Sequence, residues 1–248
     1  MSQPILQAKN LSKKFGGLRA VGDVTFEVEP FGVTSIIGPN GAGKTTLFNL
    51  LSGLYIPDEG QLFVRGEDIT RLDPVGRLNR GLARSFQITN LFFDLTVEQN
   101  LLLASQKLDS WSKLFYPANQ SPLAIARAQE LIDEFDLGEK VHELAGALSH
   151  GEQRRLEIAV TMALRPQILL LDEPTQGMSQ VDTHETSQLI SQLGQSVTIL
   201  LIEHDVELVM DLSKQVIVMA QGEKIAQGNP EEVRSNPVVQ TAYFGDAV

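Results

Sequence analysis

The sequence predicts an α/β fold with a mostly parallel sheet, an antiparallel sheet near the N-terminus and an inserted helical segment. Apolar runs separated by helical stretches are typical of a parallel sheet covered on both faces, and they occupy residues 168–171, 197–202 and 215–219. Residues 5–9, 21–28 and 61–64 are β-rich, with glycine-containing turns between them, and favour an antiparallel sheet. A third observation is a glycine-rich loop between a predicted strand and a predicted helix.

The remaining elements follow from hydrophobic periodicity and turn signals. Residues 33–37 form an apolar strand that leads into the glycine-rich loop, and residues 47–51 continue as a helix. Three further helices are predicted over 97–106, 124–135 and 152–164, partly joined by the proline-containing stretch 109–122. After residue 213 we expect a strand, a turn at Gln221-Gly222, another short strand and two short helices.

These elements predict one domain over residues 1–248, in which residues 88–160 form an inserted helical subdomain. Residues 1–87 and 161–248 then form the α/β core together with the antiparallel sheet. The chain has 248 residues, of which 42% are hydrophobic, and this is enough for a substantial core.

Composition excludes several classes of function. A net charge of −11 argues against a surface that neutralises nucleic-acid phosphates, so no nucleic-acid partner is expected. The sequence has no cysteine, which excludes a disulfide framework and a thiolate metal site and suits a reducing compartment. We predict no secretory signal, and the apolar runs are shorter than the roughly 18–20 residues that cross a bilayer. Any role at a membrane therefore depends on partner subunits.

The glycine-rich loop fits the G-x-x-x-x-G-K-[ST] phosphate-binding motif in its required strand-loop-helix context. The motif and the residue after it are Gly38, Pro39, Asn40, Gly41, Ala42, Gly43, Lys44, Thr45 and Thr46. Glycines let the backbone amides converge on an anion at the start of a helix. Lys44 is expected to reach the β- and γ-phosphates, and Thr45 to hold Mg²⁺. An ordinary glycine-rich turn is the weaker alternative, so the sequence predicts a nucleoside triphosphate site.

Two acids directly follow the apolar strand at residues 168–171. They are therefore expected at the C-terminal edge of the parallel sheet, which is where such sheets bind ligands. Asp172 is expected to hold Mg²⁺, directly or through water, and Glu173 to polarise the attacking water. Such a pair is more often a helix cap or a turn, but a preceding phosphate loop favours the catalytic interpretation. The sequence therefore predicts a triphosphate hydrolase.

The segment Leu-Ser-His-Gly-Glu-Gln at residues 148–153 resembles the signature motif of ABC ATPases, whose usual form is Leu-Ser-Gly-Gly-Gln. The same residues predict a capping box with Ser149 as N-cap and Glu152 three residues later, and the two interpretations are compatible. The resemblance implies a phosphate-loop ABC ATPase with a RecA-like core and ATP and Mg²⁺ as cofactors. It also implies a head-to-tail dimer, in which Ser149 and Gly151 address the γ-phosphate held by the opposite subunit.

Other positions match the family in the same order along the chain. The resemblance implies that Phe15 stacks on adenine, that Gln87 contacts Mg²⁺ and the water, and that His204 is the switch histidine near the γ-phosphate. The plainer alternatives are a surface phenylalanine and structural Gln and His side chains. Two positions depart from the family pattern. His150 replaces the first glycine of the signature pair, and Ser179 lies where the family usually has an aspartate nearby.

One branch of the superfamily fits best, namely the ATP-binding subunits of branched-chain amino-acid importers with their urea and amide relatives. The similar segments are residues 81–87, 95–101, 111–116, 153–159, 202–205 and 242–245. The resemblance implies a peripheral ATPase on the cytoplasmic face of the inner (plasma) membrane. Its implied partners are membrane-spanning permease subunits, a second ATPase subunit of the same or a different kind and, indirectly, a substrate-binding protein.

Two other functions remain open from the sequence. The first is an ATPase that drives lipid or lipopolysaccharide export, whose subunits share the short C-terminal tail; the 81–87 segment and the aromatic residues at 111–116 favour import over it. The second is a soluble ABC ATPase, such as one that serves iron–sulfur assembly. The cargo is not encoded here, because binding proteins and membrane subunits choose it.

Overall fold

The computed structural model describes residues 3–85, 91–106 and 121–244, and their chain divides into two compact units. The first comprises Met1–Arg84, Gln167–Glu173 and Ile190–Val248, and the second comprises Ser85–Pro166 and Pro174–Leu189. The second unit therefore differs in its boundaries from the predicted helical segment 88–160. It includes residues 174–189 because Arg155 pairs with Glu185 at 2.7 Å and Gly151 approaches Asp182 closely.

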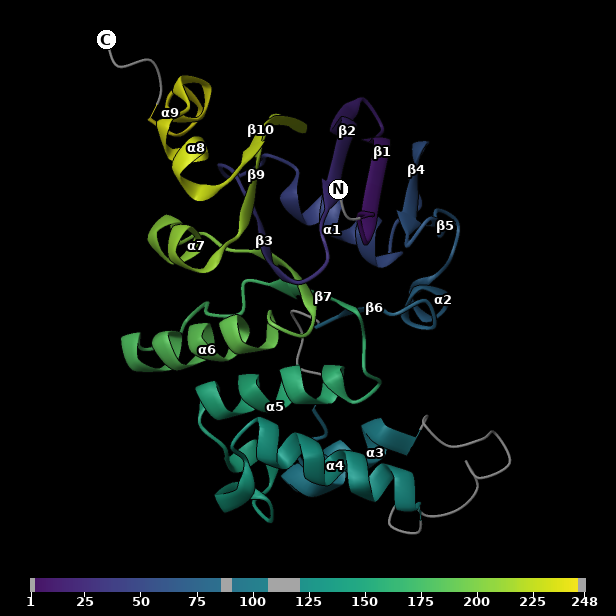
Figure 1. Ribbon diagram of the computed structural model, residues 1–248, viewed down its shortest axis with the longest axis vertical. Coiled ribbons are helices and arrows are strands. Elements are labelled where there is room, and N and C mark those ends of the chain that lie inside the picture. Colours follow the sequence, from purple (N-terminus) through teal and green to yellow (C-terminus); the bar gives the residue numbers. More distant parts are fainter. Residues whose placement is uncertain (1–2, 86–90, 107–120, 245–248) are drawn as a thin grey trace. The chain divides into compact units, whose positions relative to one another are not determined.

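The antiparallel sheet of the first unit has the strand order β2-β1-β4-β5 (Figure 1). Its strands are β1 (Leu6–Phe15), β2 (Leu18–Val28), β4 (Glu59–Val64) and β5 (Glu67–Asp68). β1 and β2 are longer than the predicted runs, because their antiparallel pairing continues to the Phe15–Leu18 pair around a two-residue turn. This extension brings the end of β1 and the start of β2 together.

The second sheet has six strands in the order β10-β9-β3-β8-β7-β6. They are β3 (Gly32–Ile37), β6 (Leu82–Arg84), β7 (Ile168–Asp172), β8 (Thr198–Ile202), β9 (Gln215–Ala220) and β10 (Glu223–Gly228). β10 pairs antiparallel with β9, and the other pairs are parallel. The predicted α/β class is therefore confirmed. The sequence analysis missed β6, because three residues are too short for a periodic signal.

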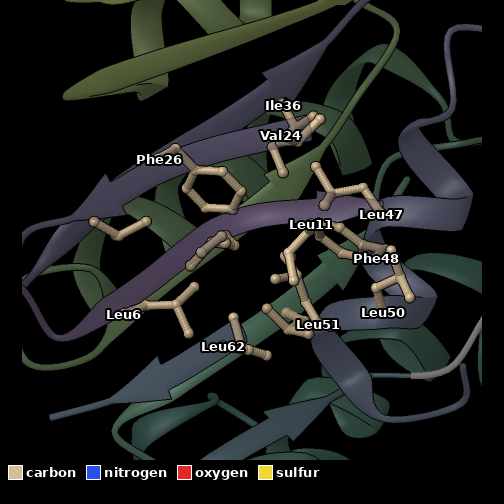
Figure 2. Close-up of a cluster of buried hydrophobic side chains, with 14 of the residues drawn as sticks. Leu6, Leu11, Val24, Phe26, Ile36, Leu47, Phe48, Leu50, Leu51 and Leu62 are labelled. Carbon is tan, nitrogen blue, oxygen red and sulfur yellow. The ribbon is translucent and has the colours of Figure 1, made fainter. Parts of the chain in front are cut away.

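Helices of the first unit are α1 (Lys44–Ser52), α2 (Pro74–Leu78), α7 (Val206–Leu212), α8 (Pro230–Ser235) and α9 (Pro237–Phe244). α1 packs between the two sheets' apolar side chains in a continuous core, in which Leu47, Phe48 and Leu51 lie with Leu11 and Phe26 (Figure 2). Each of these five side chains is at most 2% exposed. The helix that follows the phosphate loop is therefore fixed by apolar packing along its length.

The second unit contains α3 (Val97–Ser105), α4 (Pro122–Glu134), α5 (His150–Met162) and most of α6 (Gln180–Leu193), with short 3₁₀ turns at Gly138–Lys140 and Ala145–Ala147. The three predicted helices lie within two residues of α3, α4 and α5. Side chains of Thr96, Ser121 and Ser149 cap their N-termini. Over 3–85, 91–106 and 121–244, no helix has both the length and the apolar character to cross a membrane.

Candidate active site

A cavity of about 610 Å³ lies in the first unit, where β3 ends and the phosphate loop begins. Its volume falls within the range of roughly 300–1,000 Å³ that is usual for ligand sites. The loop residues Asn40, Gly41, Ala42, Gly43, Lys44, Thr45 and Thr46 line it, together with Leu18, Arg19, Ala20, Glu173, His204, Gln221 and Gly222. The structure therefore brings most of the predicted phosphate loop, the second acid and the histidine into one cavity.

The phosphate loop ends at Gly43, which is the N-cap of α1 and has a left-handed backbone with φ of 93°. In the described part of the chain, no side chain caps this helix N-terminus. The first amides of a helix lack intrahelical partners and attract anions, so they suit a phosphate group. A Cβ atom on Gly43 would lie 2.3 Å from the backbone oxygen of Ala20, so the position excludes any other residue.

We expect Gly43→Ala to weaken nucleotide binding by about tenfold or more and to lower the thermal stability of the chain. Alanine is strained at this φ, and its methyl group would push the loop away from Ala20. Titration of a fluorescent ATP analogue, with a parallel melting curve, measures both effects. Gly17→Ala is the matched control, because its Cβ would meet no atom within 4 Å. Equal affinity in Gly43→Ala and the wild type would contradict the assignment.

Lys44 is buried inside the loop, where its ammonium donates to the backbone oxygens of Gly38 at 2.7 Å and Pro39 at 3.1 Å. Burial lowers the pKa of Lys44 below its usual value, and the nearby carboxylates of Glu173 and Asp172 act in the opposite direction. Lys44 is thus held in position beside both predicted acids. Its positive charge complements the negative charge of triphosphate oxygens.

The two acids lie at the end of β7 in different environments. Asp172 is buried, and its Oδ2 accepts a hydrogen bond from Arg84 Nη2 at 2.7 Å. Glu173 lines the cavity and adopts a left-handed backbone with φ of 48°, which is uncommon for a residue other than glycine. Its Oε1 lies 2.5 Å from His204 Nε2. Such backbone strain is frequent at functional sites and supports a role in chemistry for Glu173.

Four further site residues, which the family resemblance implies, are Phe15, Gln87, Ser149 and Gly151. Phe15 is 42% exposed at the end of β1, and its ring forms a T-shaped pair with Tyr55 at a centroid distance of 5.3 Å. It does not line the cavity, although Leu18 across the turn does. Gln87 falls outside the described residues. Ser149 and Gly151 belong to the second unit.

The predicted capping box at the start of α5 is confirmed. Ser149 Oγ accepts a hydrogen bond from the Glu152 amide at 3.3 Å, and Glu152 Oε2 accepts one from the Ser149 amide at 2.8 Å. His150 is exposed in the first turn of the helix. A Cβ atom on Gly151 would lie 2.8 Å from Asp182 Oδ1, so the glycine is needed for packing within this unit.

Ser179, the second departure from the family pattern, is bound to an aspartate three residues later. Its hydroxyl donates to Asp182 Oδ2 at 2.7 Å and accepts from the Asp182 amide at 3.2 Å. Ser179 therefore acts as a local cap at the start of α6.

Two segments that the sequence analysis did not assign to the site also line the cavity. One is the start of β2, with Leu18, Arg19 and Ala20, and the other is the turn between β9 and β10. The Gly222 amide of this turn donates to the Ala42 backbone oxygen at 3.0 Å, and its own backbone oxygen accepts from Gly22. The turn was visible in the sequence, but its contact with the phosphate loop results from the tertiary fold.

Comparison with known proteins identifies the family of this chain. A family model described as ABC transporter matches residues 21–176, and one described as branched-chain amino acid ATP-binding cassette transporter matches residues 223–248. The chain belongs to the ABC transporter family. It is 43% identical to the high-affinity branched-chain amino acid transport ATP-binding protein BraF of Pseudomonas aeruginosa, with 100% of each chain covered. It is 42% identical, again over 100% of each chain, to LivG of Escherichia coli K12, which has the same description.

Solved structures agree with this assignment. The ADP conformation of MJ1267, an ATP-binding cassette of an ABC transporter, matches with a TM-score of 0.88 and 30% identity. The match covers 99% of this chain and 100% of that one. As an ABC transporter ATPase, the chain binds and hydrolyses ATP.

Proposed function

We propose that this ABC ATPase energises the uptake of branched-chain amino acids through separate membrane-spanning subunits. The observation that carries the proposal is the match of residues 223–248 to the branched-chain amino acid cassette family. The full-length similarity to BraF and LivG supports it. Lipid export and a soluble role are less well supported, because the full-length relatives at 42–43% identity are branched-chain amino acid transport ATP-binding proteins.

In the proposed mechanism, the triphosphate of ATP lies in the phosphate loop and Lys44 contacts its β- and γ-phosphates. Glu173 is the general base that orients and deprotonates the attacking water. His204, which lies 2.5 Å from Glu173, holds that carboxylate and faces the γ-phosphate. Phe15 contributes to adenine binding; it pairs with the cavity residue Leu18 across the turn between β1 and β2.

Mg²⁺ is the proposed metal, and the residues present fit it. Thr45 lines the cavity with a hydroxyl oxygen, Asp172 supplies a carboxylate beside Lys44, and Gln87 is the third proposed ligand. Mg²⁺ prefers hard oxygen ligands and keeps several waters, so one carboxylate with one hydroxyl is a suitable protein contribution. When bound, the ion neutralises charge on the phosphate oxygens.

The proposed assembly is a head-to-tail dimer on the cytoplasmic face of the membrane. Ser149 and Gly151 of one subunit then complete the ATP site of the other, and two membrane subunits receive the closing motion. The second ATPase is either another copy or a related chain, and a substrate-binding protein delivers the amino acid. In this assembly we expect the cavity to become productive only when the dimer closes.

We expect Ser149→Ala to abolish ATP-driven dimerisation, measured by size-exclusion chromatography in a Glu173→Gln background that retains ATP. The lost N-cap also costs about 1 kcal/mol of stability. Ser121→Ala is the matched control, because Ser121 caps α4 by accepting from the Ala124 amide at 3.0 Å. The control loses similar stability but still dimerises. Dimerisation of both variants would exclude Ser149 from the interface.

The direct test is purification of the protein from its native membrane in mild detergent, followed by mass spectrometry and a leucine-uptake assay in a deletion strain. Two multi-span subunits and a loss of uptake on deletion support the proposal. Export-type membrane proteins, or uptake that survives the deletion, would contradict it.

A further inference from the structure

Arg84 is the last residue of β6, and its guanidinium joins two parts of the nucleotide site. Nη2 donates to Asp172 Oδ2 at 2.7 Å. Nη1 donates to Asn49 Oδ1 at 2.6 Å and to Ser52 Oγ at 3.1 Å, both on α1. The guanidinium also lies over the Phe48 ring, 5.7 Å from its centroid. One side chain thus connects the end of β7 with the helix that starts at the phosphate loop.

The burial of this cluster distinguishes it from a surface ion pair. The side chain of Arg84 is 7% exposed and that of Asp172 is 1% exposed. A buried arginine with several directed hydrogen bonds loses its orientational freedom, because its planar fork fits only one arrangement of acceptors. Arg84 therefore fixes the position of Asp172 Oδ2 relative to α1, in addition to neutralising the charge of the carboxylate.

We propose that Arg84 is a positioning residue for the metal-binding carboxylate, holding Asp172 at a set place relative to the phosphate-loop helix through Asn49 and Ser52. The inference rests on the proposed function in that Asp172 is the Mg²⁺ ligand. Groups that orient a metal ligand typically change metal affinity by about 10–100-fold when they are removed. A buried ion pair with a purely structural role would change stability without changing the Mg²⁺ requirement.

The test measures binding of a fluorescent, non-hydrolysable ATP analogue to the full chain, over a range of Mg²⁺ concentrations and in excess chelator. Two variants weaken the positioning without removing the charge. Asn49→Ala keeps the ion pair and deletes one anchor on α1. Arg84→Lys keeps the positive charge, but a single ammonium cannot reproduce the forked contacts. Arg80→Lys is the matched control, because Arg80 forms an exposed pair with Glu67 at 2.6 Å.

We expect Arg84→Lys to raise the Mg²⁺ concentration for half-saturation by about tenfold or more, and Asn49→Ala by a smaller factor in the same direction. Binding in chelator stays within about twofold of the wild type for both variants, and Arg80→Lys matches the wild type throughout. If Arg84→Lys fails to fold, Asn49→Ala decides the question alone.

An unchanged Mg²⁺ requirement in Asn49→Ala and Arg84→Lys would overturn the inference and leave the proposed function intact. A parallel loss of affinity with and without Mg²⁺ would also overturn it, because it indicates general damage to the loop. If the wild type binds the analogue equally well in chelator and in Mg²⁺, the proposed metal site fails and the inference fails with it.

Discussion

Replacing Glu173 with glutamine is expected to leave ATP binding intact while reducing hydrolysis by roughly three orders of magnitude. Glutamine has the same shape but does not accept the proton of the attacking water. The phosphate loop and Lys44 remain unchanged, so the binding energy for the triphosphate is retained. Phosphate release under saturating ATP and the dissociation constant of a fluorescent ATP analogue measure the two effects separately.

The control for this result is Glu67→Gln, which removes an exposed carboxylate that does not line the cavity. Glu67 pairs only on the surface, with Arg80, so its loss changes stability by less than about 1 kcal/mol and leaves turnover unchanged. Unaltered phosphate release in Glu173→Gln would refute the role of Glu173. Loss of ATP binding in that variant would indicate that the carboxylate organises the cavity rather than the water.

Arg77→Met is expected to destabilise the protein by about 3–5 kcal/mol, because several buried backbone oxygens lose a charged hydrogen-bond donor at roughly 1–3 kcal/mol each. Arg77 is 0% exposed. Among the described residues, every hydrogen bond of its guanidinium goes to a backbone oxygen. These oxygens belong to Leu50, Leu51, Thr70 and Leu72. Burial lowers the pKa of Arg77 to about 10, so the group stays charged at neutral pH.

The physical reason for this effect is the C-terminus of α1. The last carbonyls of a helix lack intrahelical donors and carry partial negative charge, and here Arg77 satisfies two of them from inside the protein. Methionine fills similar volume but leaves four backbone oxygens, three of them in buried hydrogen bonds, without this donor. Urea denaturation measures the change, with Arg80→Met as an exposed control. A loss below about 1 kcal/mol would mean that water replaces the guanidinium.

The sequence by itself determined the parts of this protein that depend on local chemistry. Three of these parts are short patterns: the phosphate loop, the acids at the end of β7 and the capping box at Ser149. The residues that form each pattern are neighbours in the sequence, so the sequence alone reveals them. The same holds for the strands and helices with clear periodicity, most of which lie within a few residues of their predicted bounds. The two compact units divide the chain differently from the predicted segment 88–160, because the start of α6 joins the second unit through Arg155 and Gly151.

Only the tertiary structure decided which distant residues complete the site. Arg84 lies 88 positions before Asp172 in the chain, and no local pattern pairs them. The β9–β10 turn meets the phosphate loop at Ala42 because sheet pairing places β9 beside β3. The sequence analysis assigned no role to Arg77, yet folding buries it against the C-terminus of α1. Each contact depends on sheet order and packing, which arise from the free energy of the whole core rather than from any one segment.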